Sequence, residues 1–236
     1  MLTSPQFYRD NIAAIKNRIA AAARSAGRQP ESVTLIAVSK LQPSSAIAAA
    51  YAAGLVDFGE NYVQEALLKQ PELQNHQLTW HFIGQLQTNK TRVVAGAFDW
   101  VHTVDRLKLA QRLSEQRSPD LKPVNICLQV ALETEPGKGG VVPEALGELA
   151  LAVAKLPHLR LRGLMCIPPE TTDESLARAR FARLRGLLEE LNGSGLSLDT
   201  LSMGMSGDFE AAIKEGATHV RVGTAIFGAR PPAASI

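Results

Sequence analysis

Short runs of β-branched and aliphatic residues alternate with longer segments of helical period, and this alternation constrains the fold most strongly. The first helical segment, Gln6–Ala26, places three isoleucines on one face and ends at Gly27. The next run, Val33–Val38, is apolar without alternating polar residues, which is typical of a strand buried on both faces. Strict alternation of such strands with helices predicts a parallel sheet with helical crossovers.

The same alternation continues to the carboxyl end. The predicted strands are Val33–Val38, Val56–Gly59, Thr79–Ile83, Trp100–Val104, Val124–Ala131, Leu159–Ile167, Thr200–Met203 and His219–Val222. The predicted helices that follow them are Pro43–Ala53, Tyr62–Lys69, Thr91–Ala95, Arg106–Gln116, Pro143–Lys155, Glu174–Leu191, Asp208–Glu215 and Ala225–Gly228. Eight such units in 236 residues predict a (β/α)8 TIM-type barrel with an additional N-terminal helix, and a doubly wound open sheet is the main rival. No Pro/Gly/Ser-rich linker divides the chain, so we expect a single domain over residues 1–236, with a disordered tail at 231–236.

Composition excludes several classes of protein. With 25 Lys+Arg against 23 Asp+Glu, the net charge of +2 is too small for a nucleic-acid-binding protein. No run approaches the roughly 20 apolar residues of a membrane span, and the amphipathic first segment does not resemble a signal sequence. Cys127 and Cys166 lie in apolar runs and are expected to be buried free thiols, without the spacing of a metal site. We therefore expect a cytoplasmic protein without nucleic-acid or membrane partners, and a monomer, since no long apolar stripe is exposed.

Two strand ends near the carboxyl terminus combine glycine with hydroxyl side chains. The seventh predicted strand runs into Ser206-Gly207-Asp208, and the eighth runs into Gly223-Thr224. Small residues before a helix expose backbone N–H groups, which favour an anion. Each loop alone is equally typical of a tight turn with a capping residue. Barrels commonly bind phosphate between the loops after strands seven and eight, so the two loops together predict a phosphorylated ligand.

Lys40 directly follows the first predicted strand. Low-dielectric walls lower the pKa of a lysine and free its amine to form a Schiff base with a carbonyl compound. A lysine whose head group extends into water is the alternative interpretation. A phosphorylated aldehyde would satisfy both Lys40 and the two loops, and pyridoxal phosphate is the obvious biological example. A phosphosugar enzyme with Lys40 as an aldolase-type base also fits these residues.

Five collinear blocks of sequence resemble one family, the pyridoxal phosphate homeostasis proteins (the YggS/PROSC family). The blocks cover nearly the whole chain, and they are AVSK at 37–40, FGENYVQE at 58–65, WHFIGQLQTNK at 80–90, LSMGMS at 201–206 and VRVGTAIFG at 220–228. The resemblance implies a single barrel similar to the amino-terminal domain of alanine racemase and to ornithine decarboxylase. It also implies bound pyridoxal 5'-phosphate and a role in controlling the supply of this vitamin B6 cofactor, with enzymes that require the cofactor as recipients.

By position, the resemblance also implies a set of cofactor-binding residues. They are Lys40 as the Schiff-base lysine, Asn61 beside the phenolic oxygen, Met203 near the ring, Arg221 facing the pyridine nitrogen, and Ser206, Gly223 and Thr224 around the phosphate. An arginine keeps its proton, so the ring nitrogen that it donates to stays unprotonated and the ring is a poorer electron sink. This disfavours transamination and decarboxylation and leaves racemisation or plain carriage of the cofactor.

The sequence favours carriage over racemisation. Related racemases add a second domain with a catalytic tyrosine, whereas this chain ends at Ile236 soon after the eighth unit, and we expect no such domain. Tyr62 is the only tyrosine near a strand end, and its place on a predicted helix favours packing. His81 ends the third strand, where a general base or a core histidine with a backbone partner is possible, and we favour the core histidine. The other four histidines are interpreted as structural or exposed. We therefore predict no catalytic residue and no efficient turnover, with an amino-acid racemase as the alternative.

The loop after the fifth strand departs from the family pattern. Related proteins commonly have Ser-Lys-x-Gly there, and Gly137 occupies the serine position in this chain. Lys138 is retained and would be a transient second amine for the aldehyde or, more simply, a solvated loop lysine.

Overall fold

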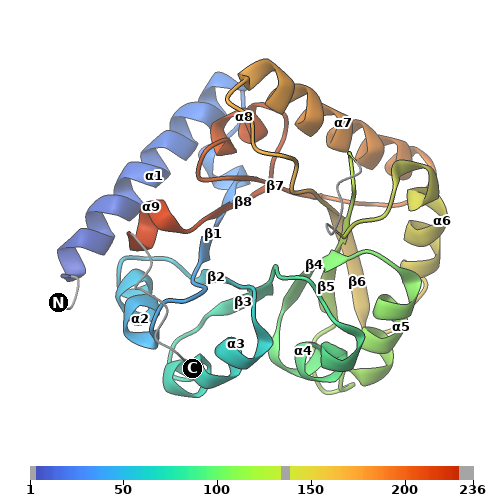
Figure 1. Ribbon diagram of the computed structural model, residues 1–236, viewed down its shortest axis with the longest axis horizontal. Coiled ribbons are helices and arrows are strands. Elements are labelled where there is room, and N and C mark those ends of the chain that lie inside the picture. Colours follow the sequence, from blue (N-terminus) through green and yellow to red (C-terminus); the bar gives the residue numbers. More distant parts are fainter. Residues whose placement is uncertain (1–3, 134–138, 229–236) are drawn as a thin grey trace.

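The computed structural model describes residues 4–133 and 139–228. Eight parallel strands close into a barrel in which β8 pairs with β1 (Figure 1). The strands are β1 (Thr34–Val38), β2 (Asp57–Glu60), β3 (Thr79–Phe82), β4 (Trp100–Val104), β5 (Val124–Gln129), β6 (Leu159–Met165), β7 (Thr200–Met205) and β8 (His219–Val222). The predicted barrel is confirmed, and the open sheet is excluded because it would leave two strand edges unpaired.

The helices surround the ring of strands, as Figure 1 shows. They are α1 (Pro5–Ser25), α2 (Ser44–Ala52), α3 (Val63–Lys69), α4 (Thr91–Ala97), α5 (Leu107–Gln116), α6 (Pro143–Val153), α7 (Glu174–Gly193), α8 (Phe209–Lys214) and α9 (Thr224–Phe227). Three short 3-10 helices lie at Pro30–Ser32, Pro71–Leu73 and Thr88–Lys90. The additional N-terminal helix is confirmed as α1, which lies against α8 and α9 and begins where the Ser4 hydroxyl accepts the N–H of Phe7.

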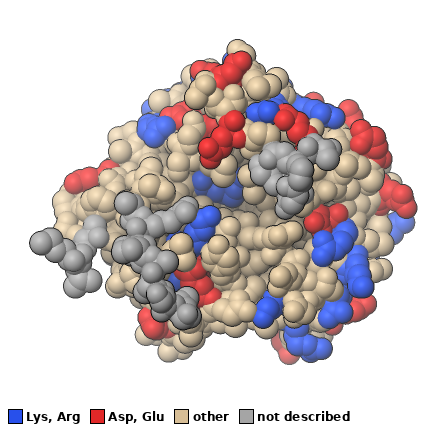
Figure 2. Space-filling view, in the orientation of Figure 1, with Lys and Arg blue, Asp and Glu red and all other residues tan. Residues whose placement is uncertain are grey.

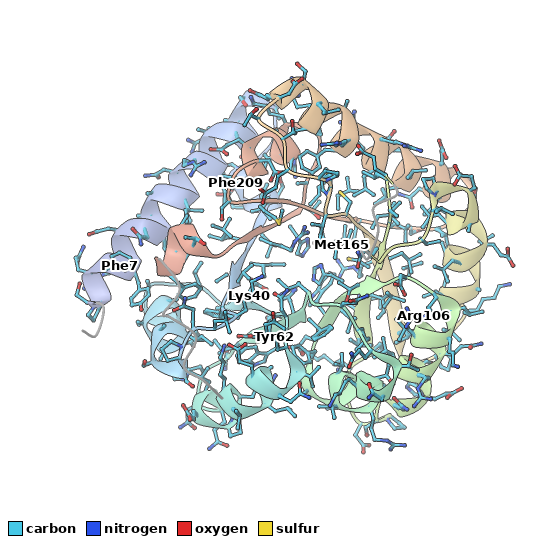
Figure 3. All side chains as sticks on the ribbon, viewed as in Figure 1. Phe7, Lys40, Tyr62, Arg106, Met165 and Phe209 are labelled. Carbon is cyan, nitrogen blue, oxygen red and sulfur yellow. The ribbon has the colours of Figure 1, made fainter. Side chains whose placement is uncertain are left out.

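The main apolar core lies between the strands and the helices. Its largest fully buried side chains are aromatic and come from both layers: Phe58, Phe82, Phe98, Phe181 and Phe209. Figure 3 places Phe209 between α8 and the barrel. Parallel strands that bury both faces require such apolar residues on the outside of the sheet, and this explains the continuous apolar runs in the sequence.

The inside of the barrel is more polar than its outside. A small apolar cluster of Trp100, Cys127 and Met165 is separate from the main core. The rings of His81, His102 and His219 pack around Trp100. Both cysteines are buried free thiols, as predicted. Buried polar groups require hydrogen-bond partners, so the barrel interior has to be organised by specific side-chain contacts.

No helix within residues 4–133 and 139–228 is both long enough and apolar enough to cross a membrane. Lys138 and the tail at 231–236 lie outside the described residues.

Candidate functional site

A cavity of about 270 Å³ opens at the carboxyl ends of the strands. Its lining combines residues at the ends of six strands, β1, β2, β3, β6, β7 and β8, together with α9: Val38, Lys40, Gln42, Asn61, Ile83, Ile167, Met205, Ser206, Arg221, Gly223, Thr224 and Gly228. Figure 2 shows basic side chains in the hollow at the centre of this face, and Figure 3 shows Lys40 on the inner side of the ring. This is the end of a barrel at which active sites are built.

The loop after β7 is held in a fixed turn that presents Ser206 to the cavity. Gly204 has a φ of +90°, and a Cβ atom at this position would lie 2.6 Å from the Cβ of Ala212. The Asp208 carboxylate accepts the N–H of Met205 at 2.7 Å, and the N–H of Asp208 donates to the carbonyl of Met205 at 3.1 Å. These bonds close the turn, and the half-buried hydroxyl of Ser206 lines the cavity.

The end of β8 approaches the end of β1 closely at Gly223. A Cβ atom at Gly223 would lie 3.2 Å from the carbonyl oxygen of Val38, so a side chain here would push the two strand ends apart. Thr224 and Ala225 begin α9, and the first N–H groups of a helix have no intrahelical acceptor. The Thr224 hydroxyl and these N–H groups therefore provide hydrogen-bond donors opposite Ser206, the arrangement that the two loops predict for a phosphate.

Arg221 forms the buried, positively charged part of the cavity wall. The side chain lies on β8, with 4% of the residue exposed, and donates from Nη1 to the Ser202 hydroxyl at 2.8 Å and from Nη2 to the Cys166 carbonyl at 2.9 Å. Burial lowers the pKa of Arg221, although a guanidinium still remains protonated. Within the described residues Arg221 has no ion-pair partner, so the guanidinium favours an electron-rich group of a ligand.

A chain of hydrogen bonds continues from Arg221 through the barrel. His102 Nδ1 lies 2.8 Å from the Ser202 hydroxyl, His102 Nε2 lies 2.9 Å from His81 Nδ1, and His81 Nε2 lies 3.0 Å from Asp57 Oδ1. Burial is the main reason that the pKa of His102 lies well below its usual value and that of His219 falls to about 3. His102 and His219 are therefore neutral structural groups inside the barrel.

The structure brings together six of the seven predicted cofactor-binding residues around one cavity: Lys40, Asn61, Ser206, Arg221, Gly223 and Thr224. Met203 does not line it. The side chain of Met203 is fully buried in the main core, and Met205 contributes to the cavity wall instead. The pairing register of β7 with β8 shifts between Ser202 and Met205, and this irregularity separates the two methionines.

Two further predictions about side chains need correction. Tyr62 does not pack inward, because 55% of it is exposed. His81 is the core histidine that we favoured, but its partners are the side chains of Asp57 and His102 instead of a backbone group. The clustering of His81, His102 and His219 was not predicted from the sequence. The available signal was that all three lie within predicted strands, whose side chains can meet inside a barrel.

The comparisons with known proteins agree with this geometry. Residues 11–231 match the model of the family described as the N-terminal domain of alanine racemase. The pyridoxal phosphate homeostasis protein of Pseudomonas aeruginosa is 61% identical over 221 residues, which cover 94% of this chain and 95% of the relative. The chain belongs to the pyridoxal phosphate homeostasis protein family. The resemblance stated from the five blocks is thus confirmed.

Other members of the pyridoxal phosphate homeostasis protein family match over similar lengths. The protein of Escherichia coli K12 is 50% identical over 227 residues, covering 93% of this chain and 95% of the relative. A solved structure of PipY from Synechococcus elongatus, described with PLP bound, is 42% identical, has a TM-score of 0.82, and covers 94% of this chain and 100% of that chain. A relative of the same fold thus has a structure with PLP bound.

Proposed function

We propose that this protein binds pyridoxal 5'-phosphate through a Schiff base on Lys40 and stores or delivers the cofactor without efficient catalysis. The observation that carries the proposal is the convergence of Lys40, Arg221, Ser206 and Thr224 on one cavity at the mouth of the barrel. An aldehyde requires an amine, a pyridine nitrogen requires a hydrogen-bond donor such as a buried cation, and a phosphate requires donors such as hydroxyl groups. Membership of the pyridoxal phosphate homeostasis family supports the same ligand.

The residues present fit this cofactor. Asn61 lines the cavity, and its Oδ1 atom is buried without a hydrogen-bond partner among the described residues. A buried polar atom without a partner is costly, and a ligand group that hydrogen-bonds the Asn61 amide would remove that cost. Pyridoxal phosphate supplies an aldehyde with which an uncharged lysine amine condenses, releasing water. Lys40 is the lysine that lines the cavity.

The other residues of the cavity would bind and orient the cofactor. Arg221 is fixed by two hydrogen bonds to Ser202 and Cys166, so its remaining N–H groups keep a constant direction. As a donor that retains its proton, Arg221 would leave the pyridine nitrogen unprotonated. Ser206 and Thr224 would hold the phosphate oxygens through their hydroxyl groups. Ile83 and Ile167 contribute apolar walls that limit access of water.

The ionisable groups of the cavity support storage and delivery over turnover. Among the described lining residues, the ionisable side chains are Lys40 and Arg221, and a guanidinium is no general base. His81 is fully buried and has both ring nitrogens engaged, which removes the candidate base named from the sequence. Burial raises the pKa of the nearby Cys166 thiol to about 12, so this thiol stays protonated. The rival function, an amino-acid racemase, requires a base on each face of the substrate.

The proposal extends to the setting of the protein. We propose a single barrel domain that acts as a monomer in the cytoplasm, with PLP-requiring apoenzymes as recipients and without nucleic-acid or membrane partners. The small net charge of +2 supports the absence of a nucleic-acid partner.

An absorption spectrum and chemical trapping test the covalent attachment. Protein incubated with pyridoxal phosphate should become yellow, and borohydride should fix the cofactor to the peptide that contains Lys40. Lys40→Ala should remove the adduct and keep the fold, because the half-buried lysine contributes little to the core. A colourless protein, or a label found on another lysine alone, would contradict the assignment.

A further inference from the structure

A buried cluster of charged side chains lies beside the turn that carries Lys40. Its members are Lys69 at the end of α3, Glu60 at the end of β2 and Glu65 in α3, and the side chains of Lys69 and Glu60 are 7% and 0% exposed. Lys69 Nζ donates to Glu60 Oε1 at 2.7 Å, to Glu65 Oε1 at 2.6 Å and to the carbonyl oxygen of Ser39 at 2.8 Å. These three bonds use all the donors of an ammonium group.

The cluster holds the backbone on both sides of Lys40. Before Lys40, the carbonyl of Ser39 accepts from Lys69, and the Ser39 hydroxyl donates to Glu60 Oε1 at 2.6 Å. After Lys40, the N–H of Leu41 donates to Glu65 Oε1 at 2.5 Å. The two neighbours of Lys40 are therefore fixed by one set of ion-paired groups that stands on β2 and α3.

The turn needs such support, because its backbone is unfavourable. Leu41 has a φ of +62°, in the left-handed region that side chains other than glycine rarely adopt. A conformation of this kind persists only where surrounding contacts determine it. Without the bonds to Glu65 and Lys69, the segment from Ser39 to Leu41 would be free to relax, and the direction of the Lys40 side chain would change with it.

The cluster is a costly way to stabilise a fold. Burial raises the pKa of Glu60, and Lys69 opposes this shift by ion pairing and hydrogen bonding. Glu60 Oε2 is buried with no hydrogen-bond partner in the described part of the chain. Buried ion pairs often contribute less stability than apolar side chains of the same size. A role in the geometry of the Lys40 turn explains why charged groups occupy this position.

We infer that Lys69 is a positioning residue for Lys40, and that Glu60 and Glu65 act with it to hold the lysine amine at the cavity. The inference rests on the proposed function, because it takes Lys40 as the attachment point of the cofactor. It predicts that loss of Lys69 impairs the bond to the aldehyde while the rest of the cavity still binds the ring and the phosphate.

Two ligands separate these effects. Pyridoxal 5'-phosphate and pyridoxine 5'-phosphate share the ring and the phosphate. Pyridoxine 5'-phosphate has an alcohol in place of the aldehyde, so it cannot form a Schiff base with Lys40. Calorimetry on the full chain measures the two affinities. Lys69→Met should lower the affinity for pyridoxal phosphate by about tenfold or more, the loss expected for one charge-assisted hydrogen bond. The affinity for pyridoxine 5'-phosphate should stay within about twofold of the original, since no contact to ring or phosphate is removed.

Arg117→Met is a matched control. Arg117 is also a buried cation, 6% exposed, and donates to three backbone carbonyls, those of Ala95, Phe98 and Lys122. It lies at the end of α5 and does not line the cofactor cavity. Its loss should destabilise the fold in the same manner and leave the ratio of the two affinities unchanged.

A second variant covers the case in which Lys69→Met does not fold. Glu65 is 21% exposed in its side chain, so Glu65→Ala removes the acceptor of the Leu41 N–H without opening the core. Glu65→Gln keeps an acceptor oxygen and should retain more of the affinity for pyridoxal phosphate than Glu65→Ala does. In protein without cofactor, the Leu41 amide should exchange its hydrogen faster in Lys69→Met and Glu65→Ala than in the original chain.

The outcomes are distinct. If Lys69→Met lowers the affinity for both ligands equally, the role of the cluster is generally structural and the inference is overturned. The same holds for Glu65→Ala if Lys69→Met does not fold. An unchanged affinity for pyridoxal phosphate would overturn it as well. If the original protein binds pyridoxal phosphate no more tightly than pyridoxine 5'-phosphate, the covalent attachment to Lys40 itself fails, and the positioning role fails with it.

Discussion

His81 Nδ1 lies 2.9 Å from His102 Nε2 inside the barrel, so one of these two nitrogens carries a proton and the other accepts it. The Asp57 carboxylate can only accept, so His81 carries a proton on Nε2 and donates to it. With His81 Nδ1 as the acceptor, His102 donates to it from Nε2. The Ser202 hydroxyl, which accepts from Arg221, then donates to His102 Nδ1. The chain thus runs in one direction, from the cavity wall to the opposite end of the barrel.

This direction predicts the tautomers of two histidines. Both rings should carry a proton on Nε2 and none on Nδ1, since His81 Nδ1 accepts from His102 and His102 Nδ1 accepts from the Ser202 hydroxyl. Nitrogen-15 spectra of protein with labelled histidine report which ring nitrogen carries the proton. His81→Asn and His102→Asn assign the two signals. A proton on Nδ1 of His102 would contradict the order of donors that starts at Arg221.

Stability should fall in mild acid because of His219. Burial lowers its pKa to about 3, whereas an unfolded histidine has a pKa near 6.5. Between these two values the unfolded chain binds a proton that the folded chain does not, so the contribution to stability is complete above about pH 6.5 and is lost as the pH falls toward 3.

Urea unfolding at several pH values between 7 and 5 measures this loss. Between its two pKa values, a histidine that binds a proton only in the unfolded chain changes the free energy of unfolding by about 1.4 kcal/mol per pH unit. His219→Gln should reduce the slope by about that amount, whatever its effect on stability at pH 7. An unchanged slope would mean that His219 binds a proton in the folded barrel.

The phosphate loops lead to a prediction about ligand preference. Ser206→Ala and Thr224→Val should each weaken the binding of pyridoxal phosphate by about 1.5–3 kcal/mol, because each removes a hydroxyl donor to a charged acceptor. Binding of pyridoxal without phosphate should be weak in the original protein and unchanged in both variants. Ser194→Ala is the control, because the Ser194 hydroxyl is exposed and bonds within α7. Equal affinity for the two aldehydes would show that these loops are ordinary turns.

The barrel and the outline of its site were predictable from the sequence, because both depend on local patterns. Uninterrupted apolar strands with helical connections leave few alternatives to a closed parallel sheet, and β4 and β8 coincide with the predicted runs Trp100–Val104 and His219–Val222. In a parallel barrel all strands end at one rim, so Lys40 and Thr224 had to approach each other although they are far apart in the sequence.

Features that depend on local irregularity or on long-range contacts were not predictable. The choice between Met203 and Met205 depends on the register shift in β7 and on the positive φ of Gly204. Lys69 has the pattern of a solvated lysine at a helix end, and only the folded structure places Glu60 and the Ser39 carbonyl within reach of it. The contacts among the histidines likewise join different strands.

The described lining of the cavity has a single candidate base, and this limits the chemistry that it can support. Lys40 and Arg221 are the ionisable side chains among these residues, and only the lysine has an uncharged form that can accept a proton. Tyr62, the tyrosine nearest to a strand end in sequence, is 55% exposed and does not line the cavity. Racemisation requires removal of a proton on one face of the substrate and its return on the other.

We therefore predict that the protein does not racemise amino acids efficiently. Incubation with L- or D-alanine in deuterated solvent should give at most slow exchange of the α-hydrogen, with retention of configuration, because a single amine can remove and return a proton only on its own face. Mass spectrometry measures the exchange, and chiral chromatography measures the configuration. Lys40→Ala should abolish any slow exchange, whereas Tyr62→Phe and His81→Asn should leave its rate unchanged, since neither side chain reaches the cavity. Exchange with racemisation faster than about 1 per second would instead establish the protein as a racemase.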